Sequence, residues 1–296
     1  MTQIDQSGKR DSPLRPDVSR AAMSRGLLGR SRRRLVTTAI GVFGIAIALG
    51  LWELISVRSG VLPGPIDVFR HIQENLLSSP YLETRGMSSG TGYLGHLAVT
   101  TRSVVFGVGL GTIVGATLGL NSLRIPAINE VVGPITAALG SAPIFVAAPF
   151  FLIWFGIQPA AQIGIVAFYT FLLMYVFSRR AAQNVAARFV ESAMTLGGSP
   201  RSIFRWIYLP ASIPEFLGGF RIALAGAWGL AAIAELLGAQ QGAGFLIKFF
   251  ASAFRLDAMV AVVVLIGAVA IIFDAVVVLV ARYLTRWVES GRRLGL

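Results

Sequence analysis

Several continuous apolar segments of about 20 residues constrain this chain more than any other feature of its sequence. Residues 35–57, LVTTAIGVFGIAIALGLWELISV, are long enough to cross a hydrocarbon core about 30 Å thick. Only 14% of the 296 residues are charged and the mean hydropathy is +0.71, whereas a soluble domain carries about 25% charged residues. Because the apolar runs are continuous and do not alternate, the sequence predicts an all-α integral membrane protein.

The sequence predicts six membrane-spanning helices, at residues 35–57, 96–120, 131–155, 161–178, 216–238 and 258–282. The third span contains Pro134, Pro143 and Pro149, which predicts a bent helix whose freed carbonyls face protein or water. The second span predicts a close approach to another helix, since it has small residues at positions 107, 109, 111, 115, 116 and 119. Residues 240–257 are too short and too charged to span, and we expect them to fold back into the bilayer.

These runs divide the chain into four regions. Residues 1–34 form a basic tail that we expect to be disordered and cytosolic. Residues 35–95 hold the first span, a short interfacial helix and a linker. Residues 96–285 form the core, which includes a long polar loop at residues 179–215, and residues 286–296 form a cytosolic C-terminal tail.

The net charge of +12 comes from Lys and Arg at the ends of the apolar runs. Six spans place both termini on one side of the membrane. The segments on that side hold 19 of the 26 Lys and Arg, against five on the other side. This asymmetry places both termini and the polar loop in the cytosol. The same rule accounts for the net positive charge without a nucleic-acid partner, so we expect none.

Several kinds of chemistry have no support in the sequence. It has no Cys, and neither His71 nor His96 has the spacing of metal ligands around it, so we expect no metal site. It contains no GxxxxGK[ST] segment, and therefore no phosphate-binding P-loop. We therefore expect that the chain is not an enzyme and binds no cofactor itself. Any energy that it uses would come from a partner subunit.

The polar loop has the sequence of a helix, a turn and a second helix. Residues 181–196 are mostly good helix formers, and Gly197 with Gly198 favours the left-handed turn that ends a helix. Ser199 is a typical N-cap, and Pro200 follows it at the first helical position, where a missing N–H costs nothing.

The second helix of the loop is expected to end at Leu209–Pro210. The segment from Ser212 to Glu215 has the pattern of a capping box that would begin the fifth span. The pattern thus predicts two short helices at an angle, lying across the cytosolic face. The alternative for such a loop is an amphipathic helix on the membrane surface.

This loop resembles the EAA signature of ABC-importer permeases, with Ser192 in place of the first Ala of that signature. The similarity extends across roughly residues 92–285. The stretches 149–157 (PFFLIWFGI) and 235–247 (ELLGAQQGAGFLI) are similar to the branch that imports nitrate, sulfonates and taurine. The resemblance assigns coupling to an ATPase to Glu191, Ser192, Ala193, Gly197, Gly198, Ser199, Pro200, Ile207, Leu209 and Pro210.

The resemblance implies a type I ABC importer permease fold with six transmembrane helices, in a bacterial plasma (inner) membrane. The chain would form the translocation pathway for a small anionic solute. Its implied partners are two cytosolic ABC ATPase subunits, which carry the ATP and Mg, and an extracytoplasmic solute-binding protein. A second copy of the chain or a sister permease would complete the pathway.

Candidates for the pathway itself are Ser141, Phe145, Trp228, Glu235 and Lys248. Ionisable side chains inside a span cost about 2.5–3.5 kcal/mol each, so they are candidates for function. An ion pair between Glu235 and Lys248 is the alternative for those two residues. Bundle packing and interface anchoring are the alternatives for the aromatic residues.

Two further charged residues lie in the predicted spans. Arg221, near the inner end of the fifth span, is expected to reach the cytosolic surface or to pair with Glu215. Asp274, in the sixth span, has no partner nearby in the sequence. Packing against a hydroxyl group of another span and a functional role are equal alternatives for this carboxylate.

Two other classes of membrane protein fit the sequence less well. A secondary transporter driven by an ion gradient is the alternative function, but it would need paired broken helices in two repeated halves, and we find no clear internal repeat. A membrane-embedded enzyme would need a constellation of catalytic residues, and no intramembrane carboxylate pair, His-rich motif or nucleophile supports one.

Overall fold

The structure is a computed structural model that describes residues 18–87 and 91–287, and every regular element in these ranges is a helix. The chain divides into two compact units, residues 1–60 and 61–296. The first unit contains α1 (Val18–Ser59), whose apolar part Ala39–Ser59 is long enough to span a membrane. Because α1 begins at Val18, residues 18–34 are helical where we expected disorder, and residues 1–17 lie outside the described part.

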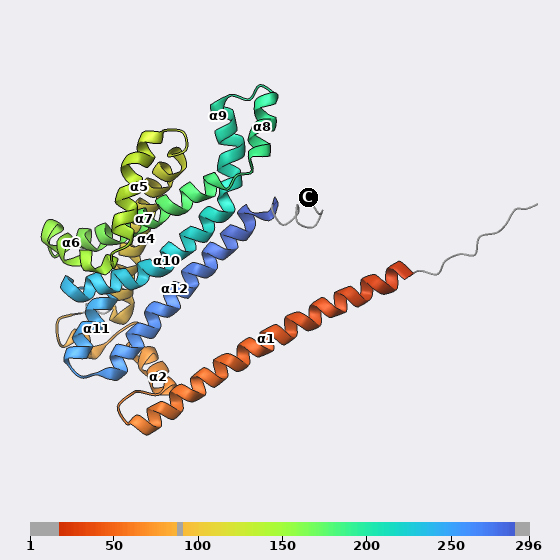
Figure 1. Cartoon of the computed structure of the whole chain (residues 1–296). Helices are drawn as coiled ribbons and strands as arrows, with labels where there is room; N and C mark the ends of the chain where they lie inside the picture. The colour runs from red at the N-terminus through yellow and green to blue at the C-terminus, as the bar shows by residue number, and fades with distance from the viewer. Residues whose placement is uncertain (1–17, 88–90, 288–296) are drawn as a thin grey trace, which may run out of the picture. The chain divides into compact units, whose positions relative to one another are not determined.

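The second unit contains the other spans (Figure 1). The four single helices that are long and apolar enough to cross a membrane are α4 (Gly92–Asn121), α7 (Pro159–Gln183), α10 (Leu209–Gly238) and α12 (Leu256–Leu284). The predicted third span is a pair bent by 100°, in which α5 (Pro126–Gly140) is followed by η1 (Ile144–Ala147) and α6 (Ala148–Phe155). With α1, the described residues therefore hold five spans, or six if the bent pair is one, as the sequence predicts.

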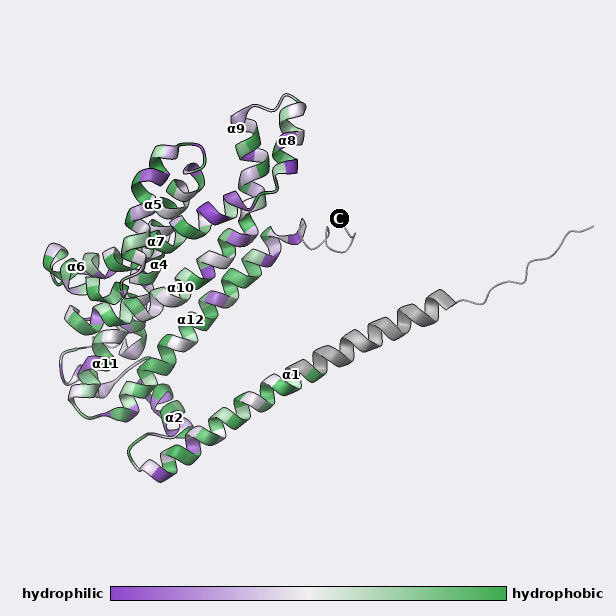
Figure 2. Cartoon of the chain, viewed as in Figure 1, coloured by the Kyte–Doolittle hydropathy of each residue, from purple (hydrophilic) through white to green (hydrophobic). Residues whose placement is uncertain are grey.

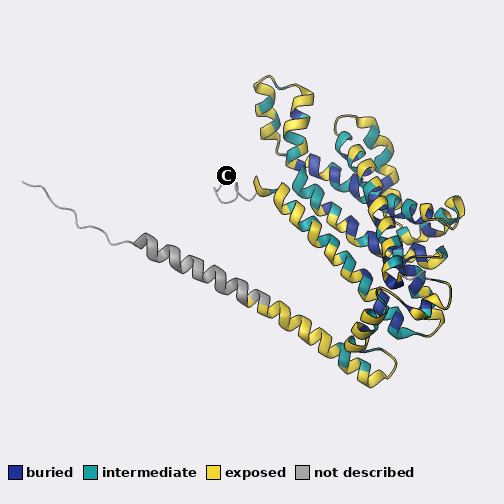
Figure 3. Cartoon of the chain, turned by 180° about the vertical axis from the view of Figure 1, so that it is seen from behind, coloured by how far each residue is buried: buried dark blue, intermediate teal, exposed yellow. Residues whose placement is uncertain are grey.

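Close packing of α4 against α7 forms the centre of the second unit. Gly107, Gly111, Gly115 and Gly119 lie along one side of α4, and a Cβ on any of them would come within 2.6 Å of an atom of α7. Buried residues gather on α4, α7, α10 and α11 (Ala243–Ser252), whereas α12 is largely exposed (Figure 3). The glycine stripe therefore allows the close helix approach that the sequence predicts.

Short helices lie at the two ends of this bundle. At one end are α2 (Pro65–Asn75), α3 (Pro80–Glu83) and α11, which is the segment that we expected to be too short to span. At the other end are α8 (Ala187–Thr195), α9 (Pro200–Ile203) and the π turn η2 (Phe204–Tyr208). Hydrophilic residues are frequent on α8 and α9, while α12 is apolar over most of its length (Figure 2).

Candidate functional site

The turn between α8 and α9 is a complete Schellman motif. The Gly198 N–H donates to the Ala193 carbonyl at 2.8 Å, and the Gly197 N–H donates to the Met194 carbonyl at 3.0 Å. Gly197 has φ +79°, the left-handed conformation that the sequence predicts. A Cβ on Gly198 would lie 2.8 Å from the Ala193 carbonyl oxygen, so neither position readily accepts another residue.

The start of the second helix also agrees with the sequence. Ser199 Oγ accepts a hydrogen bond from the Ser202 N–H at 3.2 Å, and Pro200 occupies the first helical position. Ile203 is buried, and the guanidinium of Arg124 lies 4.8 Å from the ring centre of Phe204. The turn between α4 and α5 thus contacts the base of α9.

The expected stop at Leu209–Pro210 is wrong. The Leu209 N–H donates to the Phe204 carbonyl, five residues back, and the helix continues through Pro210 into α10. Pro210 has no N–H and its ring would crowd the carbonyl four residues before it in a regular α-helix. The wider π turn η2 just before Pro210 accommodates the proline without a break.

The expected capping box at Ser212–Glu215 is also wrong, because both residues lie inside α10. Ser212 Oγ donates to the Tyr208 carbonyl at 2.7 Å. Glu215 instead accepts two hydrogen bonds from Asn184 Nδ2, at 3.0 and 2.8 Å. Asn184 follows the end of α7, so this contact ties both sides of the loop together at its base.

The α8–α9 hairpin, residues 187–203, exposes several large apolar side chains. α8 has no buried residue, and large side chains on or beside the hairpin are open to solvent, with exposed fractions of 52% for Phe189, 61% for Met194, 87% for Leu196 and 72% for Trp206. Within residues 18–87 and 91–287 no ion pair or hydrogen bond engages the Glu191 carboxylate. A rigid, capped hairpin with this surface is suited to docking against another protein.

A second polar site surrounds Glu235 in the bundle. Glu235 is fully buried, and its Oε2 accepts hydrogen bonds from Thr100 Oγ1 at 2.8 Å and from the Gly244 N–H at 2.9 Å. The Thr100 hydroxyl in turn accepts from the Ala243 N–H at 2.8 Å. The Glu235 carboxylate therefore holds the N-terminus of α11 against α4, and it does not form the expected alternative ion pair with Lys248. The sequence analysis did not identify Thr100.

The glycines of the QQGAG segment fit this arrangement. Gly242 has φ +107°, and a Cβ there would collide with the carboxylate of Glu235. The Gly242 N–H donates to His96 Nδ1 at 3.2 Å, and His96 Nε2 lies 3.1 Å from the Met87 carbonyl oxygen. This pattern places the His96 proton on Nε2.

The five candidate pathway residues do not form one site. Ser141 and Phe145 are exposed at the bend between α5 and α6, and Lys248 is exposed on α11. Trp228 is buried with its ring edge-on to Phe273, 5.3 Å between ring centres. In the described part of the chain, no hydrogen bond, ion pair or ring contact joins any two of the five.

The structure pairs the two isolated charges of the spans with each other. Arg221 Nε and Nη2 donate to the two oxygens of Asp274, each at 2.8 Å. This bidentate pair joins α10 to α12 and replaces the Arg221–Glu215 pairing that we considered. The sequence does contain two opposite charges at similar depths in two spans, which is a signal for such a pair. It does not show that these two spans are neighbours.

The end of the bundle away from α8 and α9 has its own polar cluster. His71 Nε2 lies 2.8 Å from the Tyr93 hydroxyl, and His71 Nδ1 lies 3.4 Å from Asp257 Oδ2. Burial lowers the pKa of His71. At neutral pH its ring is therefore uncharged, and its Nδ1 faces the Asp257 carboxylate. This network fastens α2 to α4 and α12.

This chain is similar to known proteins in both sequence and fold. The sequence model of the binding-protein-dependent transport system inner membrane component family matches residues 107–290, more than half of the chain. The chain is 26% identical to the putative aliphatic sulfonates transport permease of Bacillus subtilis (83% of this chain, 86% of that protein). It is 24% identical to the taurine transport system permease of Escherichia coli (86% and 90%) and 25% identical to the nitrate import permease of Leptolyngbya laminosa (91% and 95%).

The fold is similar to a chain of the methionine ABC transporter MetNI in an inward-facing conformation. The TM-score is 0.54 with 21% identity, over 70% of this chain and 97% of that chain. The predicted all-α importer-permease fold is therefore confirmed. This fold consists of apolar spans around a glycine-packed centre, with a capped hairpin at one end.

This chain belongs to the family of binding-protein-dependent transport system inner membrane components. The resemblance that the sequence indicated, to ABC permeases of the nitrate, sulfonate and taurine branch, is confirmed. Members of this family are the membrane subunits of transport systems, and they are not ATPases themselves.

Proposed function

We propose that this chain is the permease subunit of an ATP-driven importer for a small anionic solute of the sulfonate, taurine or nitrate kind. The α8–α9 hairpin couples the permease to a cytosolic ATPase subunit. An extracytoplasmic binding protein delivers the solute, and a second permease, identical or a sister chain, completes the pathway. Relatives named for sulfonate, taurine and nitrate transport support the solute class.

The observation that carries the proposal is the rigid geometry of the hairpin. The Schellman turn at Gly197 fixes the angle between α8 and α9, and α9 continues through η2 into α10 without a break. A displacement of the hairpin is therefore transmitted along a continuous helix from Pro200 to Gly238, which is about 58 Å long at 1.5 Å per residue. A flexible linker would dissipate such a movement.

The pathway follows the bent pair and its neighbours. Irregular backbone at membrane depth has to face protein or water, which favours the bend that carries Ser141 and Phe145 as pathway lining. Trp228 and Glu235 are buried within the bundle and would position neighbouring helices. Lys248 is exposed on α11 and would face the outer mouth.

The orientation can be tested directly, because the chain has no Cys of its own. Single variants Arg201→Cys in α9 and Arg85→Cys after α3 place thiols at exposed positions on opposite ends of the bundle. We expect a membrane-impermeant maleimide to label Arg85→Cys in intact cells and Arg201→Cys only after the membrane is opened. Labelling of Arg201→Cys in intact cells would place the hairpin outside and contradict the proposal.

Docking of the ATPase can be tested at the most exposed apolar residue of the hairpin. Leu196→Asp puts a charge on a side chain that is 87% exposed, so the fold should tolerate it while an apolar contact with a partner should not. We expect a loss of about 2 kcal/mol or more in binding, roughly 30-fold, measured as ATPase retained on the tagged permease during purification.

The matched control for this docking test is Leu77→Asp, at a residue that is 68% exposed at the opposite end of the bundle. It should retain the ATPase at the wild-type level. Equal ATPase retention by both variants would show that the hairpin does not bind the ATPase.

Reconstitution with the ATPase and binding protein should give ATP-dependent uptake from a panel of taurine, nitrate and ethanesulfonate, and an ion gradient should not replace ATP.

A further inference from the structure

The turn that ends α11 carries the one non-glycine residue with a positive φ in the described part of the chain. Phe254 has φ +52°, a left-handed conformation that bulky residues rarely adopt. Its side chain is also 91% exposed, more than any other large apolar side chain that the structure describes. Backbone strain of this kind is frequent at functional sites, so this turn is a candidate site of interaction.

The turn is a second Schellman motif, with phenylalanine at the position where the α8–α9 turn has glycine. The Phe254 N–H donates to the Ala251 carbonyl at 3.2 Å, and the Arg255 N–H donates to the Phe250 carbonyl at 2.9 Å. Gly197 is the equivalent residue between α8 and α9. A glycine at position 254 would relieve the strain. Because the Phe254 ring is almost fully exposed, packing within the chain does not offset this strain.

The residues around Phe254 hold the turn in place. The guanidinium of Arg255 lies 3.0 Å from Asp257 Oδ2 and 4.7 Å from the ring centre of Tyr81. The Tyr81 ring stacks on Phe250, which is buried, with 6.2 Å between the ring centres. The Phe254 ring therefore projects from a fixed backbone. A pocket in a folded protein requires such a fixed direction, whereas a fluid lipid surface accepts an aromatic ring in any orientation.

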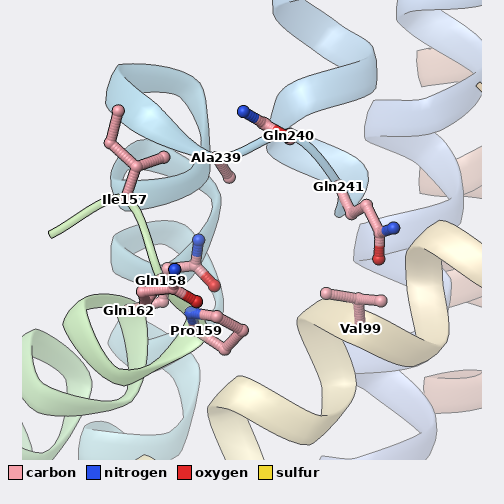
Figure 4. Close-up of a pocket in the computed structure, with 8 residues that line it drawn as sticks. All are labelled: Val99, Ile157, Gln158, Pro159, Gln162, Ala239, Gln240 and Gln241. Carbon is pink, nitrogen blue, oxygen red and sulfur yellow. The ribbon is translucent and has the colours of Figure 1, made fainter.

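α11 connects this turn to a polar pocket of about 300 Å³, at the end of the bundle away from the α8–α9 hairpin (Figure 4). Gln240 and Gln241, just before α11, line the pocket, and the turn follows the last residue of α11, Ser252. The 10 residues of α11 separate the two by about 15 Å, at 1.5 Å per residue. One side of a typical protein interface, about 800 Å², is large enough to cover both.

We propose that Phe254 is an anchor for the extracytoplasmic binding protein, and that its ring enters an apolar pocket on that folded partner. The inference rests on the proposed import function and names the residue through which the outer partner docks. The family to which the chain belongs depends on a binding protein, and the Lys and Arg distribution places this end of the bundle outside. The strained turn fixes the anchor before docking, so less free energy is lost in ordering it.

The test measures the Kd of the permease–ATPase complex in lipid nanodiscs for the binding protein that supports its uptake in proteoliposomes. Phe254→Gly removes the ring and also relieves the backbone strain. The Kd should rise at least about tenfold, because the anchor is lost. The unfolding temperature of the permease in detergent should also rise, by about 1–2 °C, because the strain is lost. A purely structural role for the ring would not weaken binding while stabilising the fold.

Phe69→Ala is the matched control, because Phe69 is a 61% exposed aromatic residue of the regular helix α2 at the same end of the bundle. It should keep the wild-type Kd. A wild-type Kd for Phe254→Gly, or an equal rise in both variants, would overturn the inference while wild-type uptake stays intact. A wild-type complex that imports no solute with ATP would overturn the proposed function and this inference with it, so the two failures are distinguishable.

A fluorescent label distinguishes protein docking from membrane anchoring. Because the chain has no Cys, Phe254→Cys allows an environment-sensitive fluorophore to be attached at this position alone. In nanodiscs its emission should report water before the binding protein is added and shift to the blue afterwards. Blue-shifted emission before the addition would place residue 254 in lipid, and emission that does not change on addition would leave it outside the interface. Either result would overturn the inference.

Discussion

Gly197→Val should reduce ATP-driven uptake at least about tenfold without preventing insertion of the chain. Gly197 has φ +79°, and a β-branched residue held in this region costs about 1–3 kcal/mol. No atom lies within 4 Å of the position where its Cβ would be, so the effect comes from the backbone alone. The Schellman turn opens, α8 loses its fixed angle to α9, and hydrolysis by the bound ATPase no longer moves α10.

The measurement is solute uptake and ATP hydrolysis by the same proteoliposomes, since uncoupling lowers the first more than the second. Gly86→Val is the matched control. Gly86 has φ +66°, also with open space around it, but it lies at the other end of the bundle. It should suffer similar strain and keep uptake within about twofold of the wild type, because its turn transmits no movement. Equal losses of uptake in both variants would show that Gly197→Val acts only by destabilising the protein.

The hairpin was predictable because its signals are local. Gly197, Gly198, Ser199 and Pro200 each act on their own backbone or on that of residues within five positions, so the sequence alone determines the turn and the cap. The membrane spans were predictable for the same reason, since length and apolar composition belong to each segment separately.

The features that the sequence did not reveal depend on contacts between distant segments. Whether Pro210 ends a helix depends on the π turn before it, and no residue of the segment marks that turn in the sequence. The partner of Glu235 is Thr100, 135 residues away, and the partner of Arg221 is Asp274, 53 residues away. Helix order in the bundle decides these pairs, and in a single sequence no local pattern reports that order.

Gly111→Leu should nearly abolish accumulation of the folded permease. A Cβ at this position would lie 2.6 Å from the Thr170 Cβ and 2.9 Å from the Phe171 backbone nitrogen, and it would also collide with the Ala167 carbonyl oxygen. Two of these three atoms belong to the backbone of α7, so rotation of a side chain cannot relieve the clash. Overpacking of a tight interface typically costs about 1–3 kcal/mol, and a leucine adds three more carbons than the Cβ alone.

Gly109→Leu separates this packing effect from the loss of a glycine as such. Gly109 lies on the same helix, two residues away, and no atom is within 4 Å of the position where its Cβ would be. The Gly109→Leu variant should accumulate to the wild-type level and unfold in detergent at the wild-type temperature. An apolar leucine is favourable on an open face of a span, and leucine has a higher helix propensity than glycine. Equal loss in both variants would mean that α4 packs through its other face. If Gly111→Leu accumulates and imports normally, the α4–α7 contact is not the centre of the bundle.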